Sequence, residues 1–239
     1  MALKWILFDK DGTLIDFDMS WMKVDIQMVD EFVEKYISQE NVEHAYKTLG
    51  VDKEKDQVLP GTPMACGSLD EIIQNFNALA GEDVSEWTRQ TSQYLIDHRI
   101  PEIKCIEGMT DALDALKHAG YQIGILTSDT KKGTEQFVEA TDTEAFFDFI
   151  ISTEANAAEK PNPEVLCPLF EHVSDLRAEE IAIVGDSPND IQTAINSGLG
   201  LSIAVLTGVG QEHELQHADY IFQSAPEAVN LLVDKKNEK

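Results

Sequence analysis

The stretch WILFDKDGTLIDF, residues 5–17, places Asp9 and Asp11 directly after a short apolar run. The run predicts a buried strand over residues 4–9. Two carboxylates at the end of a strand repel each other unless something offsets their charge. Gly12 follows at once and gives the backbone the freedom to turn. The folded protein must therefore place a compensating charge or hydrogen-bond donor near these two carboxylates.

The composition is that of a folded and strongly acidic protein. The 239 residues, of which 43% are hydrophobic, suit one larger domain or a core domain with a smaller inserted one. The formal net charge of -26 argues against nucleic acid or an anionic membrane as a partner, since both are polyanions. Any phosphate site must then rely on local donors, a lysine or a metal cation.

The cysteines and the apolar start bear on the cellular location. Cys66, Cys105 and Cys167 are widely spaced and form no C-x-x-C pair, which is typical of reduced thiols in a cytosol. The run WILF is far too short for a signal peptide or a membrane span. We therefore expect a cytoplasmic protein with no membrane partner, and the sequence leaves monomer and homodimer open.

Strand and helix patterns alternate from about residue 108 to the C-terminus, which indicates a parallel α/β sheet. Between the first strand and this region lie roughly 90 residues of helical pattern. The simplest interpretation is a helical domain inserted after the first strand. The remaining strands are expected at residues 122–126, 146–152, 180–187, 201–208 and 218–222.

Polar side chains follow three of the expected strands. Ligands of parallel α/β sheets bind at the carboxyl ends of the strands, so these side chains should meet at one edge. A cluster of carboxylates is unfavourable unless a cation neutralises it, and oxygen ligands suit Mg²⁺. The set comprises Asp9, Asp11, Thr127, Ser128, Asp186 and Asp190.

The two acids of the first strand suit different chemical roles. Asp9 ends the strand and can act as a nucleophile. Asp11, on the turn, can act as a general acid and then as a base. Lys160, in the segment AEKPNPE, can reach the same cleft and neutralise Asp9 or a phosphoryl group. Each feature alone has an ordinary structural explanation, as a turn, a cap or a solvated lysine, and only their order and common edge favour function.

Four segments in this order resemble the motifs of the haloacid dehalogenase-like superfamily, whose members are mostly Mg²⁺-dependent phosphatases. The match spans residues 1–15 and about 105–225, and it is highly specific as a set. The insertion resembles the helical cap of the type-one branch, which closes over the phosphate and excludes water. The segments are DKDGTL (9–14), ILTSD (125–129), EKPNPE (159–164) and GDSPND (185–190).

The resemblance implies an α/β fold with two domains. Residues 1–15 and 105–239 would form a Rossmann-like parallel sheet core, and residues 16–104 an inserted all-helical cap domain. It also implies Mg²⁺ as the cofactor and a small phosphorylated metabolite as the partner.

The resemblance further implies a role for each site residue. Asp9 would be the nucleophile that forms an aspartyl-phosphate, and Asp11 would protonate the leaving oxygen and later activate water. Thr127 would bind phosphoryl oxygens, with the backbone N–H of Ser128 as a further donor. Lys160 would steady Asp9 and the phosphoryl charge. The metal site would be formed by Asp9, the backbone carbonyl of Asp11, Asp186, and Asp190 directly or through water.

Several activities stay open at this point. The first is a phosphatase for a small organic phosphate, with phosphoglycolate-like substrates to be tried before nucleotide or sugar phosphates. The alternative is a phosphoglucomutase-like phosphotransferase with the same nucleophile. A dehalogenase would have little use for Asp11. A receiver-like module that stores phosphate on an aspartate is much shorter and has no reason for a cap of this size.

Overall fold

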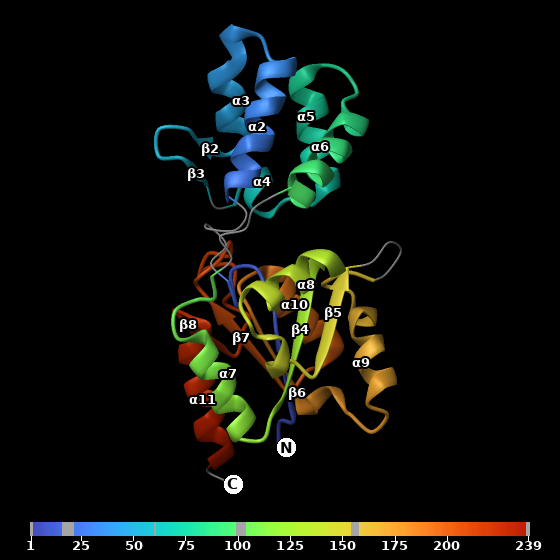
Figure 1. Ribbon diagram of the computed structural model, residues 1–239, viewed down its shortest axis with the longest axis vertical. Helices are drawn as coiled ribbons and strands as arrows, with labels where there is room; N and C mark the ends of the chain where they lie inside the picture. Colours follow the sequence, from blue (N-terminus) through green and yellow to red (C-terminus); the bar gives the residue numbers. More distant parts are fainter. Residues whose placement is uncertain (1, 16–21, 60, 99–103, 154–157, 238–239) are drawn as a thin grey trace. The chain divides into compact units, whose positions relative to one another are not determined.

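The computed structural model describes residues 2–15, 22–59, 61–98, 104–153 and 158–237. The chain divides into two compact units, one of residues 1–17 with 103–239 and one of residues 18–102 (Figure 1). We describe each unit by itself. The predicted boundaries, after residues 15 and 104, adjoin segments that lie outside the described residues, so their exact positions stay predictions.

The larger unit is built on a six-stranded sheet in which every pair of neighbours is parallel. The predicted parallel α/β core is therefore confirmed. The strand order is β5-β4-β1-β6-β7-β8. The strands are β1 (Trp5–Phe8), β4 (Gln122–Thr130), β5 (Phe149–Thr153), β6 (Ile181–Gly185), β7 (Leu201–Val205) and β8 (Tyr220–Phe222).

Helices cover both faces of this sheet (Figure 1). Residues of α7, α8 and α11 pack on one face, and residues of η3, α9 and α10 pack on the other. The α-helices are α7 (Met109–His118), α8 (Lys131–Ala140), α9 (Cys167–His172), α10 (Pro188–Ser197) and α11 (Ala225–Asn237), with 3₁₀ turns η2 (Glu144–Phe146), η3 (Pro163–Leu166) and η4 (Ala178–Glu180).

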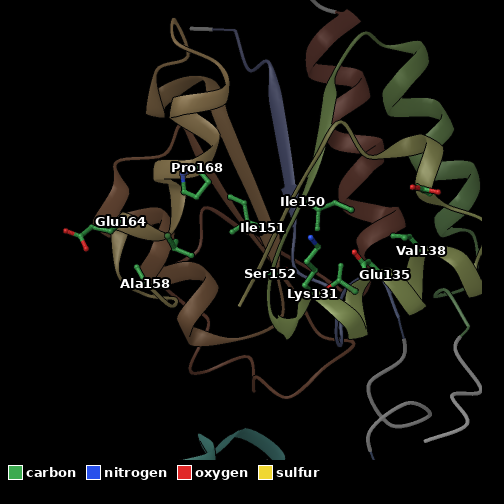
Figure 2. Close-up of a pocket in the computed structure, with 12 residues that line it drawn as sticks. Lys131, Glu135, Val138, Ile150, Ile151, Ser152, Ala158, Glu164 and Pro168 are labelled. Atoms are coloured by element: carbon green, nitrogen blue, oxygen red, sulfur yellow. The ribbon is translucent and has the colours of Figure 1, made fainter. Parts of the chain in front are cut away.

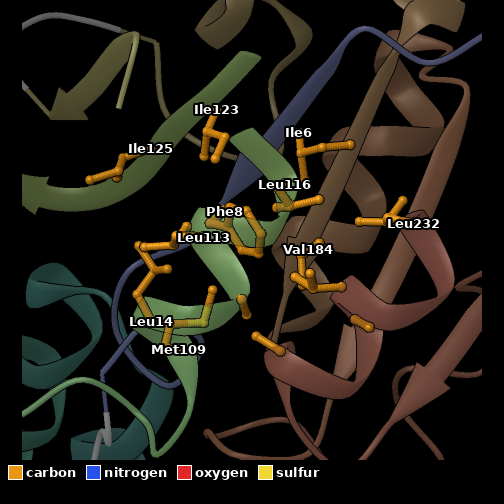
Figure 3. Close-up of a cluster of buried hydrophobic side chains, with 14 of the residues drawn as sticks. Ile6, Phe8, Leu14, Met109, Leu113, Leu116, Ile123, Ile125, Val184 and Leu232 are labelled. Atoms are coloured by element: carbon orange, nitrogen blue, oxygen red, sulfur yellow. The ribbon is translucent and has the colours of Figure 1, made fainter. Parts of the chain in front are cut away.

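Strand β1 explains why the apolar run is continuous. Ile6 and Phe8 belong to one hydrophobic cluster, whereas Trp5 and Leu7 belong to another. Successive side chains of a strand point to opposite faces, and both faces of this sheet are covered. Figure 3 shows the first cluster, with side chains from β1, β4, β6, α7 and α11. Polar groups on β1 are thus confined to its end.

The smaller unit is mainly helical (Figure 1). Its hydrophobic core contains a group of packed aromatic rings. Phe32 stacks on Phe76 with ring centroids 4.0 Å apart, and Trp87 packs beside Phe32. Ser68, directly before the helix that begins at Leu69, forms a capping box with Glu71. The helices are α2 (Met22–Tyr36), η1 (Gln39–Asn41), α3 (Val42–Leu49), α4 (Pro63–Cys66), α5 (Leu69–Ala80) and α6 (Ser85–His98).

One detail of the predicted cap is wrong, because it is not all helical. Strands β2 (Val51–Asp52) and β3 (Gln57–Val58) form a small antiparallel hairpin. Gly50, at φ 84°, ends α3, and a charged turn separates the buried Val51 from Val58. Two-residue strands are too short to show an alternating pattern in sequence.

None of the helices in the described part of the chain has the length and apolar content needed to cross a membrane.

Leu113→Ala should lower the free energy of unfolding by roughly 2–5 kcal/mol, because it leaves a cavity in the core. Leu113 on α7 is fully buried in the cluster that contains Phe8. The matched control is Ile195→Ala on α10, where the side chain is 51% exposed. Urea unfolding of both variants tests this, and equal losses would contradict the assigned core.

Candidate active site

The strand pairing brings three segments of the site to one edge of the sheet. Phe8 pairs with Ile125 on one side and with Val184 on the other. Asp9 follows Phe8 directly, and its backbone N–H donates to the carbonyl oxygen of Val184 at 2.9 Å. Thr127 and Asp186 each lie two residues beyond the paired position. Parallel pairing thus places the ends of β1 and β6 beside Thr127 of β4. The predicted end of this strand at residue 126 is wrong, because β4 continues to Thr130.

Lys160 joins two of the predicted aspartates in a buried contact. Its Nζ donates to Oδ1 of Asp9 at 2.7 Å and to Oδ1 of Asp190 at 2.6 Å. The Lys160 side chain is 5% exposed and that of Asp190 is fully buried. Carboxylate oxygens of Asp9, Asp186 and Asp190 all lie within 4.8 Å of one another. Residues far apart in sequence therefore form one carboxylate cluster.

Asp186 is held by neutral donors and by close backbone packing. Thr13 Oγ1 donates to its Oδ1 at 3.2 Å, and the Val209 N–H donates to its Oδ2 at 2.8 Å. A side chain at Gly12 or Gly208 would collide with this carboxylate. The segment after β7, which the sequence analysis extended as a strand, instead folds over Asp186, and Thr207 Oγ1 donates to the Gly12 carbonyl at 2.6 Å.

Asp190 has a structural and an electrostatic role at once. Its Oδ2 accepts from the N–H and the hydroxyl of Ser187, at 3.0 and 2.7 Å, in a capping box that starts α10. Its Oδ1 faces Lys160. Gly185 leaves room for this arrangement, because a Cβ there would overlap Asp190. The helix cap therefore orients the carboxylate toward the cluster.

Burial and mutual repulsion shift the titration of the cluster. Burial raises the pKa of Asp9 to about 6, which Lys160 opposes and Asp190 reinforces. Burial, followed by the charges of Asp9 and Asp190, holds the pKa of Asp186 well above its ordinary value. Burial would lower the pKa of Lys160, but its two carboxylate partners raise it, so it stays charged.

The donor set fits a divalent metal ion. When all three buried carboxylates are ionised, they share one ammonium group, which leaves two negative charges without compensation inside the cluster. All three ligands are oxygens, the type that Mg²⁺ prefers, and Mg²⁺ commonly takes only a few carboxylates. The charge and the ligand chemistry of the cluster are thus compatible with a divalent cation such as Mg²⁺.

Asp11 lies in a different environment from the other three aspartates. Its carboxylate oxygens lie 2.8 and 2.7 Å from Nζ of Lys10, and this Nζ is 3.0 Å from Oδ2 of Asp129. The Lys10 side chain is 1% exposed. This pair of Lys10 and Asp11 was not predicted. Alternation along β1 is the signal that could have found it, since it places position 10 on the buried side of Ile6 and Phe8.

The hydroxyl residues that follow Leu126 differ in burial. Thr127 is buried, and its Oγ1 accepts from the Asp129 N–H at 3.0 Å. A hydroxyl that accepts a hydrogen bond can still donate one to a phosphoryl oxygen. Ser128 is exposed. Thr127 and Ser128 thus lie within β4 and not after its end, although Thr127 is level with the ends of β1 and β6. The binding roles of both residues stay predictions.

A cavity of about 490 Å³ lies elsewhere, along the edge strand β5 (Figure 2). Lys131 and Glu135 of α8 line one side, and Glu164 and Pro168 line the other. None of the predicted site residues lines it. The chemistry of the strand-end cluster is therefore independent of this cavity.

The parallel sheet with carboxylates and a lysine at its carboxyl edge defines the class as an α/β protein with a candidate catalytic site at that edge. A model of the haloacid dehalogenase-like hydrolase family matches residues 6–204, and the chain belongs to that family. The predicted resemblance is thereby confirmed.

Relatives and solved structures agree over nearly the whole chain. The chain is 24% identical to Pyrophosphatase PpaX of Bacillus mycoides over 97% of its own length and 98% of that protein. It is similar in fold to a predicted phosphoglycolate phosphatase from Haemophilus somnus, with a TM-score of 0.72, 17% identity and coverage of 97% and 98%. A candidate beta-phosphoglucomutase from Thermotoga maritima gives a TM-score of 0.64, 17% identity and coverage of 97% and 99%.

Mg²⁺ should raise the melting temperature more at about pH 7.5 than at about pH 5, because protons and the metal compete for the cluster. Folding raises the pKa of Asp9 from 3.8 to about 6. The metal-free fold thus binds this proton more tightly than the unfolded chain, and it loses stability as the pH rises through that window. A bound cation offsets the loss.

Thermal melts with and without Mg²⁺ at both pH values measure this effect. Asp186→Asn should remove most of the shift. Asp114→Asn, on the exposed surface of α7, should leave the shift intact. A Mg²⁺ shift that is equal at both pH values would contradict the assigned site.

Proposed function

We propose that this protein is a Mg²⁺-dependent phosphatase that hydrolyses a small organic phosphomonoester through a phosphoryl group carried on Asp9. One observation carries the proposal: Asp9, at the end of β1, contacts Lys160 inside a buried cluster that has two uncompensated negative charges. A nucleophilic carboxylate, a fixed cation and room for a divalent metal are the parts that phosphoryl transfer requires.

The first step transfers the phosphoryl group to the protein. A carboxylate oxygen of Asp9 attacks phosphorus, and the bond from phosphorus to the leaving oxygen breaks. Asp11 gives its proton to that oxygen, so the alcohol departs neutral. Lys160 holds Asp9 through Oδ1 and offsets the charge that gathers on the phosphoryl oxygens. Thr127 donates its hydroxyl hydrogen to one of these oxygens.

The second step releases phosphate and restores Asp9. Water attacks phosphorus, Asp11 takes a proton from it, and the bond from phosphorus to Asp9 breaks. Asp9, Asp186 and Asp190, with the backbone carbonyl of Asp11, are the groups that would hold Mg²⁺. Bound there, Mg²⁺ supplies positive charge for the phosphoryl oxygens and the carboxylates.

The sequence and the relatives support two substrate classes. A small phosphomonoester such as phosphoglycolate follows from the family branch, and one structural neighbour carries that name. Inorganic pyrophosphate is the second candidate, because relatives that match nearly end to end are named pyrophosphatases. A phosphoglucomutase-like transfer is favoured only by a fold similarity, and it would require a bisphosphate for turnover.

A cytoplasmic location agrees with the thiols of the described residues. Cys105 and Cys167 are both unpaired. Free thiols persist where the environment is reducing.

Asp9→Asn should reduce hydrolysis of p-nitrophenyl phosphate roughly 10³-fold or more, because an amide cannot act as the nucleophile. Asp175→Asn, on the exposed surface of the same unit, should keep full activity. Steady-state assays with Mg²⁺, before and after chelation, give the measurement. The nucleophile assignment fails if Asp9→Asn keeps most of its turnover, and the metal assignment fails if chelation has no effect.

A panel of phosphorylated metabolites with Mg²⁺ should show hydrolysis of phosphoglycolate without any added bisphosphate. Pyrophosphate, nucleotide monophosphates and sugar phosphates belong in the same panel. A higher kcat/KM for pyrophosphate would assign the second substrate class. Turnover only in the presence of a sugar bisphosphate would replace the phosphatase by the phosphotransferase.

A further inference from the structure

Lys10 forms a buried ion-pair network beside the carboxylate cluster. Its side chain is 1% exposed, and its Nζ contacts both carboxylate oxygens of Asp11. The same Nζ contacts Oδ2 of Asp129 at 3.0 Å. Burial opposes the charge of Lys10, but the two carboxylates raise its pKa above the ordinary value. A buried ammonium is tolerated only when it is well paired, so these contacts are required for Lys10 to lie there.

The position of Asp129 in this network is fixed by its neighbours. Its Oδ1 accepts from the Thr130 N–H at 2.7 Å. Thr130 in turn caps α8 by accepting from the Gly133 N–H. A side chain at Gly133 would collide with the Asp129 carboxylate. The end of β4 and the start of α8 therefore hold Asp129 in place. Lys10, which contacts both Asp129 and Asp11, links the Asp11 carboxylate to this fixed position.

The network separates Asp11 from the other aspartates of the site. Asp9, Asp186 and Asp190 form the close carboxylate cluster, which does not include the Asp11 side chain. In a site with two uncompensated charges, a fourth carboxylate without a partner would be drawn toward the metal ion. The Lys10 contact gives Asp11 a competing partner.

We propose that Lys10 is a positioning residue, which holds the Asp11 carboxylate outside the metal cluster and aims it at the leaving oxygen of the substrate. This inference rests on the proposed function, in which Asp11 exchanges a proton with the substrate. Lys10 acts through Asp11 and has no contact with the reacting phosphorus. The effect of Lys10 on kcat/KM should therefore depend on how strongly the leaving oxygen requires protonation.

Aryl phosphates of similar shape separate this role from a purely structural one. Phenyl phosphate needs a proton donor because phenolate leaves poorly, whereas dinitrophenyl phosphate needs little help. In Lys10→Met/Asp129→Asn, which removes the ammonium and its anchoring charge together, no buried charge is left at position 129. Its kcat/KM should fall about 10²-fold for phenyl phosphate and less than about threefold for dinitrophenyl phosphate.

The control is Lys117→Met, which removes a half-buried lysine paired with Asp148 in the same unit. This variant should change kcat/KM for phenyl phosphate and for dinitrophenyl phosphate by the same small factor. When Lys10→Met and Asp129→Asn are added to Asp11→Asn, they should cause no further loss on phenyl phosphate, because the residue they position is already disabled. Thermal melts confirm that each variant is folded.

Equal losses on the two aryl phosphates would overturn the inference and leave Lys10 a structural residue. A further loss in the Asp11→Asn background would also overturn it. No turnover of either substrate by the unmodified protein would overturn the proposed function, and this inference with it.

Discussion

The contact of Lys160 with Asp9 and Asp190 is the interaction on which the active site depends. It links the end of β1, the segment before η3 and the start of α10 through two short ion pairs. Loss of one partner of a buried ion pair leaves an uncompensated charge, which costs about 3–5 kcal/mol. The lysine therefore stabilises the buried carboxylates, and the same contact holds Asp9, the nucleophile of our proposal, in place.

The architecture of the sheet explains why these charges gather at one edge. Both faces of β1 are covered by hydrophobic clusters, so its interior admits only apolar residues. Polar residues of β1 can follow only where the strand stops, and parallel pairing places this end next to the end of β6 and next to Thr127 of β4. Glycines keep the edge open. Gly12, at φ 80°, turns the chain where a side chain would strike Asp186.

The convergence of Asp9, Asp186, Asp190 and Lys160 could be predicted from local sequence patterns. Apolar runs followed by polar residues indicate strand ends, and the order of the four motifs indicates which segments meet. Other parts were not predicted. Alternation along β1 places position 10 on the face of Ile6 and Phe8, but lysine is rarely buried, so Lys10 between two acids looks like a solvated residue. The hydrogen bond from Val209 to Asp186 is donated by a backbone N–H, so the residue type at position 209 does not predict it. The hairpin of β2 and β3 is too short for periodicity to indicate it.

The two lysines divide five acidic side chains into two groups with different charge balance. Lys10 serves Asp11 and Asp129, which leaves one negative charge, whereas Lys160 serves a cluster that keeps two. The electrostatic attraction for a divalent cation is therefore stronger at the cluster of Asp9, Asp186 and Asp190 than at the pair of Asp11 and Asp129. This difference matters in a chain of net charge -26, whose overall field repels an anionic substrate. Attraction of such a substrate must then arise locally, at the cluster that contains Lys160 and where our proposal places the metal ion, whereas Asp11 is paired with Lys10.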